Sequence, residues 1–402
     1  MINLSLNKKV IIFGFIFTFF SSFGQSFFLG LFNAPLREEL GITHGQFGSI
    51  YASATICSSL LLIWVGKKID DYKLLYYSFF VIILLSLSSL FFSFINSIYL
   101  LAIGIFLMRF SGQGLMSHTS TTAISRFFEK TRGKALSTIW FGLSTAEFIL
   151  PVLITYLFVI YSWRTIWQGI AVLIIILLPI ITSKCITAIN LSSREKISKN
   201  LNKIKIKSWK RKDVIKDYRF YIISLNMLAG PWIITGIFVY QSFISEAKLW
   251  SLYAIPKAFM IYSITSIFSL ILSGFLVDKF TSRKLIPIIN IPLLLSMMTL
   301  ILTKNEISAY IFLGMIGISN GLANVLGSST WAEIYGVKYI GSIKALTTAL
   351  MVFSTAFGTA LFGILIDQGF SIENIALISG AYIVVSLVLL LFFRKKLEPI
   401  KV

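Results

Sequence analysis

Charged residues, and acidic ones above all, are scarce in this chain of 402 residues. Asp, Glu, Lys and Arg together make up 13% of the sequence, whereas a soluble domain carries about 25%. A soluble fold with so few charges would lack polar surface, which excludes a globular cytosolic enzyme. The two cysteines, Cys57 and Cys185, form neither a disulfide framework nor a metal-ligand spacing. We therefore expect no metal and no cofactor.

Long apolar runs fill the sequence instead, with 56% hydrophobic residues and a mean hydropathy of +0.85. A helix needs about 20 apolar residues to cross a bilayer. A lone backbone segment in hydrocarbon satisfies its own hydrogen bonds only as a helix. The runs predict an all-α membrane protein with twelve transmembrane helices. We place these at residues 10–32, 46–66, 75–95, 98–124, 135–160, 166–183, 220–244, 254–277, 285–303, 307–331, 345–366 and 375–393.

Basic residues are distributed unevenly between the two sides of these spans. With both termini in the cytoplasm, 30 Lys and Arg lie on the cytoplasmic side and five on the outer side. This asymmetry fixes the orientation of a multi-pass protein of the plasma membrane. The net charge of +20 therefore reflects topology, and we expect no nucleic-acid partner.

The longest polar stretch divides the chain into two sets of six spans. We predict an N-terminal bundle over residues 1–183, a cytoplasmic linker over 184–219 and a C-terminal bundle over 220–402. The Lys, Asn and Ser content of the linker fits two interpretations. Either it lies on anionic headgroups, partly as an amphipathic helix, or it is a plain linker whose lysines only set orientation.

An internal repeat supports the same division, with three short matches in order at offsets of 208, 207 and 210 residues. Because six spans per repeat is an even number, both halves have the same orientation. Transporters whose two bundles rock about a central site have this parallel arrangement. The matches are Gly66 to Asp70 with Gly274 to Asp278, Gly114-Leu115 with Gly321-Leu322, and Lys134-Ala135 with Lys344-Ala345.

These motifs resemble those of the major facilitator superfamily. The family's loop motif after helix 2, roughly G-x-x-x-D-R-x-G-R-[KR], resembles residues 66–73, where Asp71 replaces the usual arginine, and its second copy resembles residues 274–284. The helix-4 motif resembles Arg109-Phe-Ser-Gly112-Gln113-Gly114. The stretches SSFGQSFFLGLF, RGKALS and WAEIYGVKYIGSIKA resemble a bacterial branch of the family. That branch is distantly similar to the oxalate–formate and monocarboxylate carriers.

Two departures from the family patterns reduce the range of expected substrates. The helix-5 signature of drug/proton antiporters, ending in G-P-x-x-G-G, is absent, because the segment here reads Glu147-Phe-Ile-Leu-Pro151-Val-Leu. The similarity to oxalate carriers implies cations in helices 8 and 11, yet residues 345–366 contain none. These departures disfavour multidrug efflux and a dicarboxylate.

The repeated loop motif predicts a latch on the cytoplasmic side. Gly66 and Gly274 would permit close helix approach. Asp70 and Asp278, at helix ends, could be held by nearby cations such as Arg283 or by a helix N-terminus. The alternative is a packing and capping element that is the same in every conformation.

Polar residues within the spans are the default candidates for substrate binding or coupling. Arg109 and Gln113 share one face of their helix by spacing, and Asn320 and Asn324 share another. The resemblance implies a cavity lined by helices 1, 4, 5, 7, 8, 10 and 11. The alternative for the amides is that they hold helices together. The candidates are Gln25, Arg109, Gln113, Glu147, Asn226, Tyr240, Gln241, Lys257, Asn320 and Asn324.

Three further local expectations concern single positions. Lys257, one turn inside the outer mouth, either attracts an entering anion or snorkels. Pro231 is expected to kink the span over 220–244. His118 is assigned a packing or headgroup role.

Of the 16 acidic residues, only Glu147 falls deep within a predicted span. Its depth differs from that of Arg109 by about 6 Å at 1.5 Å per helical residue, so we predict that the two residues form or can form an ion pair. An anion competing for Arg109 would release Glu147 to take up a proton, which would couple anion and proton entry. The alternative is a static structural pair.

The sequence therefore predicts a secondary active transporter working by alternating access, with a small organic anion such as a monocarboxylate as substrate and proton symport as its coupling mode. No phosphate-binding GxxxxGK[ST] motif is present, so we expect no ATP-driven transport. The spans contain no cluster of catalytic residues, so we expect no enzyme. The alternatives are an efflux antiporter for amphipathic compounds and a non-transporting membrane receptor or sensor. We expect a monomer whose partners are the lipid bilayer, the substrate and protons.

Overall fold

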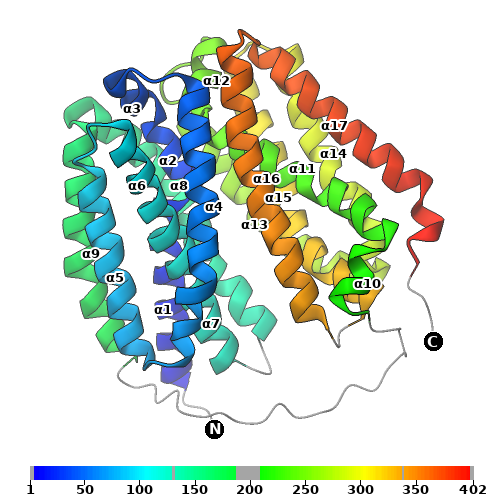
Figure 1. The fold of residues 1–402 in the computed structure, drawn as a ribbon, viewed down its shortest axis with the longest axis horizontal. Coiled ribbons are helices and arrows are strands. Elements are labelled where there is room, and N and C mark those ends of the chain that lie inside the picture. The colour runs from blue at the N-terminus through cyan, green and yellow to red at the C-terminus, as the bar shows by residue number, and fades with distance from the viewer. Residues whose placement is uncertain (1–3, 129–131, 187–208, 337–338, 399–402) are drawn as a thin grey trace. The chain divides into compact units, whose positions relative to one another are not determined.

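The computed structural model describes residues 4–128, 132–186, 209–336 and 339–398 (Figure 1). Within these ranges every regular element is a helix. Among these residues, eleven helices are long and apolar enough to cross a membrane, and a bent pair, Lys8–Gly24 with Ser26–Leu40, brings the number to twelve when it is counted as one span. The predicted all-α fold with twelve transmembrane helices is confirmed.

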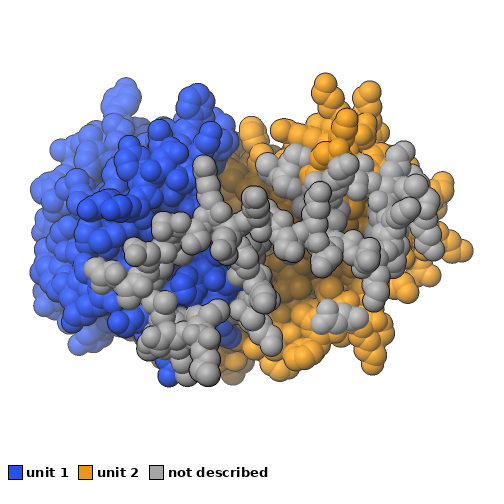
Figure 2. All heavy atoms as spheres, turned by 90° about the horizontal axis from the view of Figure 1, so that it is seen from below, with its two compact units in different colours: residues 1–196, 238–242 blue, residues 197–237, 243–402 orange. Residues whose placement is uncertain are grey.

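The chain separates into two compact units (Figure 2). The first comprises residues 1–196 and 238–242, and the second comprises residues 197–237 and 243–402. Six of the twelve spans belong to each unit. Most of the predicted linker, residues 187–208, lies outside the described residues, so its amphipathic helix stays a prediction.

The helices of the first unit, coloured blue to teal in Figure 1, include short 3₁₀ segments and one π-helical segment, η4. They are α1 (Leu4–Ser21), η1 (Ser22–Gly24), α2 (Ser26–Leu29), η2 (Gly30–Phe32), α3 (Asn33–Leu40), α4 (His44–Lys67), η3 (Lys68–Asp70), α5 (Leu74–Phe92), α6 (Ile98–Met108), η4 (Arg109–Met116), α7 (Ser117–Phe127), α8 (Arg132–Ile160) and α9 (Trp163–Ile186).

The second unit, green to red in Figure 1, contains the remaining helices. They are α10 (Arg211–Ile215), α11 (Tyr218–Val239), α12 (Gln241–Ala247), α13 (Ala254–Phe280), α14 (Ser282–Leu302), α15 (Ile307–Tyr335), α16 (Ile340–Asp367), α17 (Ile372–Phe392) and η5 (Arg394–Lys396). The ends of α11 and α12 that meet at Tyr240 count with the first unit.

Three spans differ from the sequence prediction in their interior. The first is broken at Gln25, whose backbone is extended (φ −84°, ψ 154°), and its two parts meet at a bend of 42°. The fourth changes to π-helical geometry at Arg109. The seventh runs through Pro231 and ends at Val239, and the chain turns at Tyr240, inside the predicted span; the kink at Pro231 stays a prediction.

Side-chain caps set several helix starts. Thr43 and Gln46 form a capping box at the start of α4, in which Gln46 N donates to Thr43 Oγ1 and Thr43 N donates to Gln46 Oε1. Gly41, with φ 62°, ends α3 in the left-handed conformation that favours glycine. The loops near the helix ends are therefore fixed by local sequence.

Both units pack their helices in a repeated pattern. α5 packs against α9 in the first unit, and α14 packs against α17 in the second. These are the third and sixth spans of their units, as the parallel repeat predicts. Small residues allow close packing elsewhere, since a Cβ at Gly321 on α15 would lie 2.3 Å from the Ser266 carbonyl oxygen on α13.

Candidate substrate site in the first unit

The break in the first span lies directly against the π-helical segment η4. A Cβ built on Gly24 would lie 2.3 Å from the Met108 carbonyl oxygen and 2.5 Å from the Gln113 amide nitrogen. A Cβ on Gly112 would lie 2.7 Å from the Gly24 amide nitrogen. Two backbones therefore touch at a point where neither is α-helical, an arrangement that is frequent at functional sites.

Arg109 is the first residue of η4, and its side chain reaches this break. Arg109 is 3% exposed, and its Nη1 donates to the Gly24 carbonyl oxygen at 3.1 Å. The break leaves this carbonyl next to the extended residue Gln25, where a helix end needs an outside donor. Nε of Arg109 is buried without a hydrogen-bond partner among the described residues.

Tyr51 on α4 also contacts the side chain of Arg109. The guanidinium carbon lies 5.3 Å from the centre of the Tyr51 ring, within the range of a cation–π contact. Tyr51 is 1% exposed, and its buried hydroxyl has no hydrogen-bond partner of regular geometry. Tyr51 is not among the residues predicted from the sequence, because nothing in its spacing links it to a residue 58 positions later.

Glu147 is buried on α8, 7% exposed. Neither Glu147 nor Arg109 takes part in an ion pair within the described part of the chain. The predicted Arg109–Glu147 ion pair is therefore not formed in this structure. Similar depth does not fix the direction in which a side chain points, and Arg109 points to Gly24.

The π geometry also alters the face on which the polar residues of this span lie. We expected Arg109 and Gln113 to share one α-helical face, but an i→i+5 pattern has more residues per turn. Gln113 is half-buried, as is Gln25 in the break. His118 Nε2 lies 3.0 Å from the Gly66 carbonyl oxygen, in agreement with its predicted packing role.

The first copy of the predicted latch contains an ion pair. Asp70 pairs with Arg126 of α7, and Arg126 Nη1 also donates to the Ile69 carbonyl oxygen at 3.4 Å. A Cβ on Gly66 would lie 3.3 Å from the His118 ring, so this glycine does stand at a close approach.

The second copy differs. A Cβ on Gly274 would meet no atom within 4 Å among the described residues, so the close approach expected there is wrong. The side chain of Asp278 lies outside the described residues. Arg283 faces Glu398 at 3.8 Å, and its amide nitrogen donates to Glu333 Oε2 at 3.1 Å.

The candidate residues of the second unit lie on different helices. Asn226 is fully buried and donates to Ser386 Oγ at 3.4 Å. Asn320 Nδ2 donates to the Tyr262 hydroxyl at 2.9 Å, whereas Asn324, one turn further along α15, is exposed. Asn226 and Asn320 thus both bridge helices.

Tyr240 and Gln241, at the junction of α11 and α12, count with the first unit. The Tyr240 hydroxyl donates to the His44 carbonyl oxygen at 2.8 Å, and Gln241 Nε2 donates to the Phe27 carbonyl oxygen at 2.9 Å. Both side chains therefore bind backbone. Lys257 is exposed in the first turn of α13, with Nζ 5.8 Å from the centre of the Tyr253 ring.

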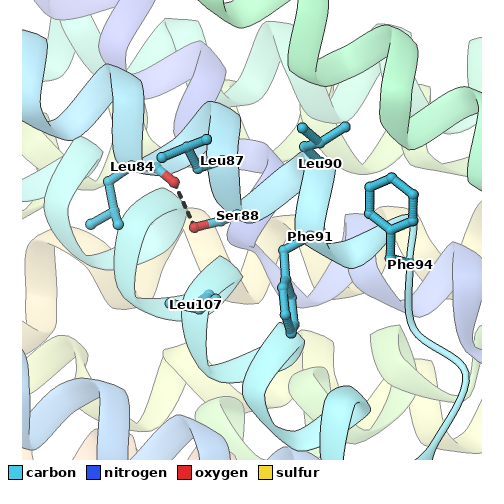
Figure 3. Close-up of a pocket in the computed structure, with 7 residues that line it drawn as sticks. All are labelled: Leu84, Leu87, Ser88, Leu90, Phe91, Phe94 and Leu107. Carbon is cyan, nitrogen blue, oxygen red and sulfur yellow. Dashed lines mark hydrogen bonds between the residues drawn. The ribbon is translucent and has the colours of Figure 1, made fainter.

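A groove of about 350 Å³ lies on α5 and α6 (Figure 3). Its one polar side chain, Ser88, donates to the Leu84 carbonyl oxygen at 2.6 Å. An apolar groove of this kind does not suit a charged solute, and it contains none of the predicted site residues. Its lining is Leu84, Leu87, Ser88, Leu90, Phe91, Phe94 and Leu107.

Comparison with solved structures shows transporters of the same fold. A bacterial homologue of the human lysosomal transporter Spinster, inward-facing and unoccupied, is 11% identical, with a TM-score of 0.72 and 98% coverage of both chains. The nucleoside transporter NupG is 14% identical, with a TM-score of 0.74 and coverage of 98% of this chain and 100% of that one. No curated protein matches the sequence.

A family model covers nearly the whole sequence. The model described as "Major Facilitator Superfamily" matches residues 14–348 and 234–401. Together with the twelve spans and the transporter structures of the same fold, this match indicates a multi-pass membrane transporter rather than an enzyme. The chain belongs to the Major Facilitator Superfamily.

Proposed function

We propose that this protein is a secondary carrier of a small organic anion, such as a monocarboxylate, and that Arg109 binds the carboxylate group. One observation carries the proposal: a guanidinium is buried in a spanning helix and pairs with no acid in the described chain. A buried charge is costly unless a partner compensates it. An anionic substrate would supply that partner.

The donors of Arg109 suit a carboxylate. An arginine carries five N–H donors in a planar fork, and here Nη1 donates to Gly24 while Nε has no partner. A carboxylate can accept two parallel hydrogen bonds from such a fork. The Tyr51 hydroxyl, also without a regular partner, would add one donor.

We also propose that the anion enters together with a proton carried by Glu147. An ionised carboxylate buried without a partner is costly. An acid of this kind inside a transporter can take up and release a proton as its surroundings change. The burial of Glu147 and the lack of an ion-pair partner among the described residues support this role.

The nucleoside transporter among the structural neighbours raises a second substrate class. A neutral nucleoside would leave the charge of Arg109 uncompensated, so the unpaired guanidinium favours an anion. The excess of Lys and Arg on one side of the spans supports an orientation with both termini in the cytoplasm. The resemblance to a bacterial branch of the family supports a location in the bacterial inner membrane. No feature of the proposed site requires a second copy, and we propose a monomer.

A thermal-shift screen tests the substrate class. Purified protein is heated with small monocarboxylates, dicarboxylates and nucleosides, because a ligand that binds the folded state raises the melting temperature by mass action. We expect a shift with at least one monocarboxylate, lost in Arg109→Gln and kept in Arg394→Gln, which removes one exposed charge. A shift with nucleosides alone would contradict the proposal.

A further inference from the structure

At one end of the first unit, Arg164 ties three helix ends together. Its Nη1 and Nη2 donate to the two carboxylate oxygens of Glu39 in the last turn of α3, the Nη2–Oε1 distance being 2.5 Å. Nη2 also donates, at 2.7 Å, to the carbonyl oxygen of Ile95, just after α5. Arg164 itself is the second residue of α9. We call Glu39, Arg164 and Ile95 the first clamp.

Lys248 ties three helix ends together in the second unit. It follows the last residue of α12 and is 3% exposed. Nζ donates to Glu373 Oε1 at 2.6 Å, to the Thr303 carbonyl oxygen at 3.2 Å and to the Leu300 carbonyl oxygen. Glu373 is the second residue of α17, and Thr303 follows α14. We call Lys248, Glu373 and Thr303 the second clamp.

The two clamps are the same junction in the two repeats. Positions 39 and 248 are 209 residues apart, as are positions 164 and 373, and positions 95 and 303 are 208 apart. These offsets match those of the repeated motifs. In both clamps the cation also binds the carbonyl end of the third helix, where a cation is favourable. The acid and the cation, however, have exchanged places: the acid is at position 39 in the first clamp, and the cation is at the equivalent position 248 in the second. We call this order of acid and cation the polarity of a clamp.

Helix dipoles explain the polarity of only one clamp. A helix favours an acid in its first turn and a cation beyond its last turn. The second clamp follows this rule, with Glu373 in the first turn of α17 and Lys248 after α12. The first clamp contradicts it at both ends, because Glu39 lies in the last turn of α3 and Arg164 in the first turn of α9. The dipoles of α3 and α9 therefore do not account for the placement of the acid and the cation in the first clamp.

We propose that the opposed polarity of the clamps specifies which helices pair when the protein folds. Two homologous repeats present equivalent helices that could exchange partners. If the end of α3 met the start of α17, Glu39 would face Glu373. If the end of α12 met the start of α9, Lys248 would face Arg164. Each exchange would place like charges together, which disfavours the wrong partner.

Four charge arrangements test the proposal. Glu39→Lys with Arg164→Glu gives the first clamp the polarity of the second, and Lys248→Glu with Glu373→Arg does the reverse. Each double variant keeps an ion pair in a geometry that the other unit already shows. It gives both clamps the same polarity, however, so like charges would no longer oppose an exchange of helices. The quadruple variant restores opposed polarity. Lys68→Asp with Asp71→Lys, an exchange of an exposed pair, is the matched control.

The full chains are denatured in dodecyl sulfate and refolded in mild detergent, and the monomer fraction and its melting temperature are measured. We expect the monomer fraction to fall several-fold in both double variants, with dimers formed by exchange between chains. The quadruple variant and the control should refold like the wild type. Double variants that refold fully would overturn the proposal. A quadruple variant no better than the double variants would overturn it too, since the effects would then be local.

Discussion

The contact between the break in the first span and η4 leaves no room for a side chain at Gly24. A methyl group there would lie 2.3 Å from the Met108 carbonyl oxygen, 2.5 Å from the Gln113 amide nitrogen and 3.0 Å from Gly112 Cα. All three are backbone atoms, so no side-chain rotation can relieve the overlap. Overpacking of this kind costs about 1–3 kcal/mol. We expect Gly24→Ala to lie near the upper end, about 3 kcal/mol.

Gly169 on α9 provides the matched control, because a Cβ there would meet no atom of the described residues within 4 Å. Gly169→Ala should be neutral or stabilise the protein by about 0.5–1 kcal/mol, since alanine is the better helix former. Thermal unfolding of both variants in detergent measures the difference. If Gly24→Ala melts at or above the temperature of Gly169→Ala, the close contact described here is wrong.

Three further predictions concern single side chains. Glu373→Gln leaves the buried Lys248 with carbonyl partners only, and because Glu373 is about one-third exposed, we expect the free energy of unfolding to fall by about 2 kcal/mol. Glu39→Gln, in the more exposed first clamp, should lower it by only about 0.2–1 kcal/mol. Unfolding curves in which Glu39→Gln is the more destabilising variant would contradict this order. Leu249, 92% exposed with φ 56°, is in a conformation that costs a non-glycine residue about 1 kcal/mol; Leu249→Gly should therefore raise the melting temperature, whereas an unchanged or lower value would argue against strain. Glu147→Gln should bind the anion but no longer accumulate it in proteoliposomes under an imposed pH gradient, and accumulation that persists would remove Glu147 as the proton carrier.

The spans could be predicted from the sequence because each is a long local apolar run, and hydropathy needs no tertiary information. The irregular backbone geometry inside the spans could not be predicted in this way. The break at Gln25 and the π geometry at Arg109 exist because two backbones meet at Gly24 and Gly112. Glycines mark such contacts only once the partner helix is known. The same contact turns Arg109 toward helix 1, which is why depth alone gave the wrong partner for Glu147.

The residues of the candidate site and those of the clamps differ in how far they can be identified from the sequence. Arg109 and Glu147 could be identified as candidates because ionisable residues are rare within spans. Tyr51 could not, because a tyrosine in a membrane helix is ordinary until its neighbour is known. The clamp residues lie at helix ends, where charges are common, and only the shared offset of 209 residues distinguishes them.

Anion exchange in proteoliposomes tests the central claim most directly. Vesicles loaded with the monocarboxylate identified by thermal shift are mixed with labelled anion outside, and uptake is compared among the wild type, Arg109→Gln, Arg109→Lys and Arg394→Gln. If Arg109 binds the carboxylate, Arg109→Gln abolishes exchange, Arg109→Lys retains part of it with weaker affinity, and Arg394→Gln exchanges like the wild type. Exchange by a folded Arg109→Gln protein with unchanged affinity would contradict the account.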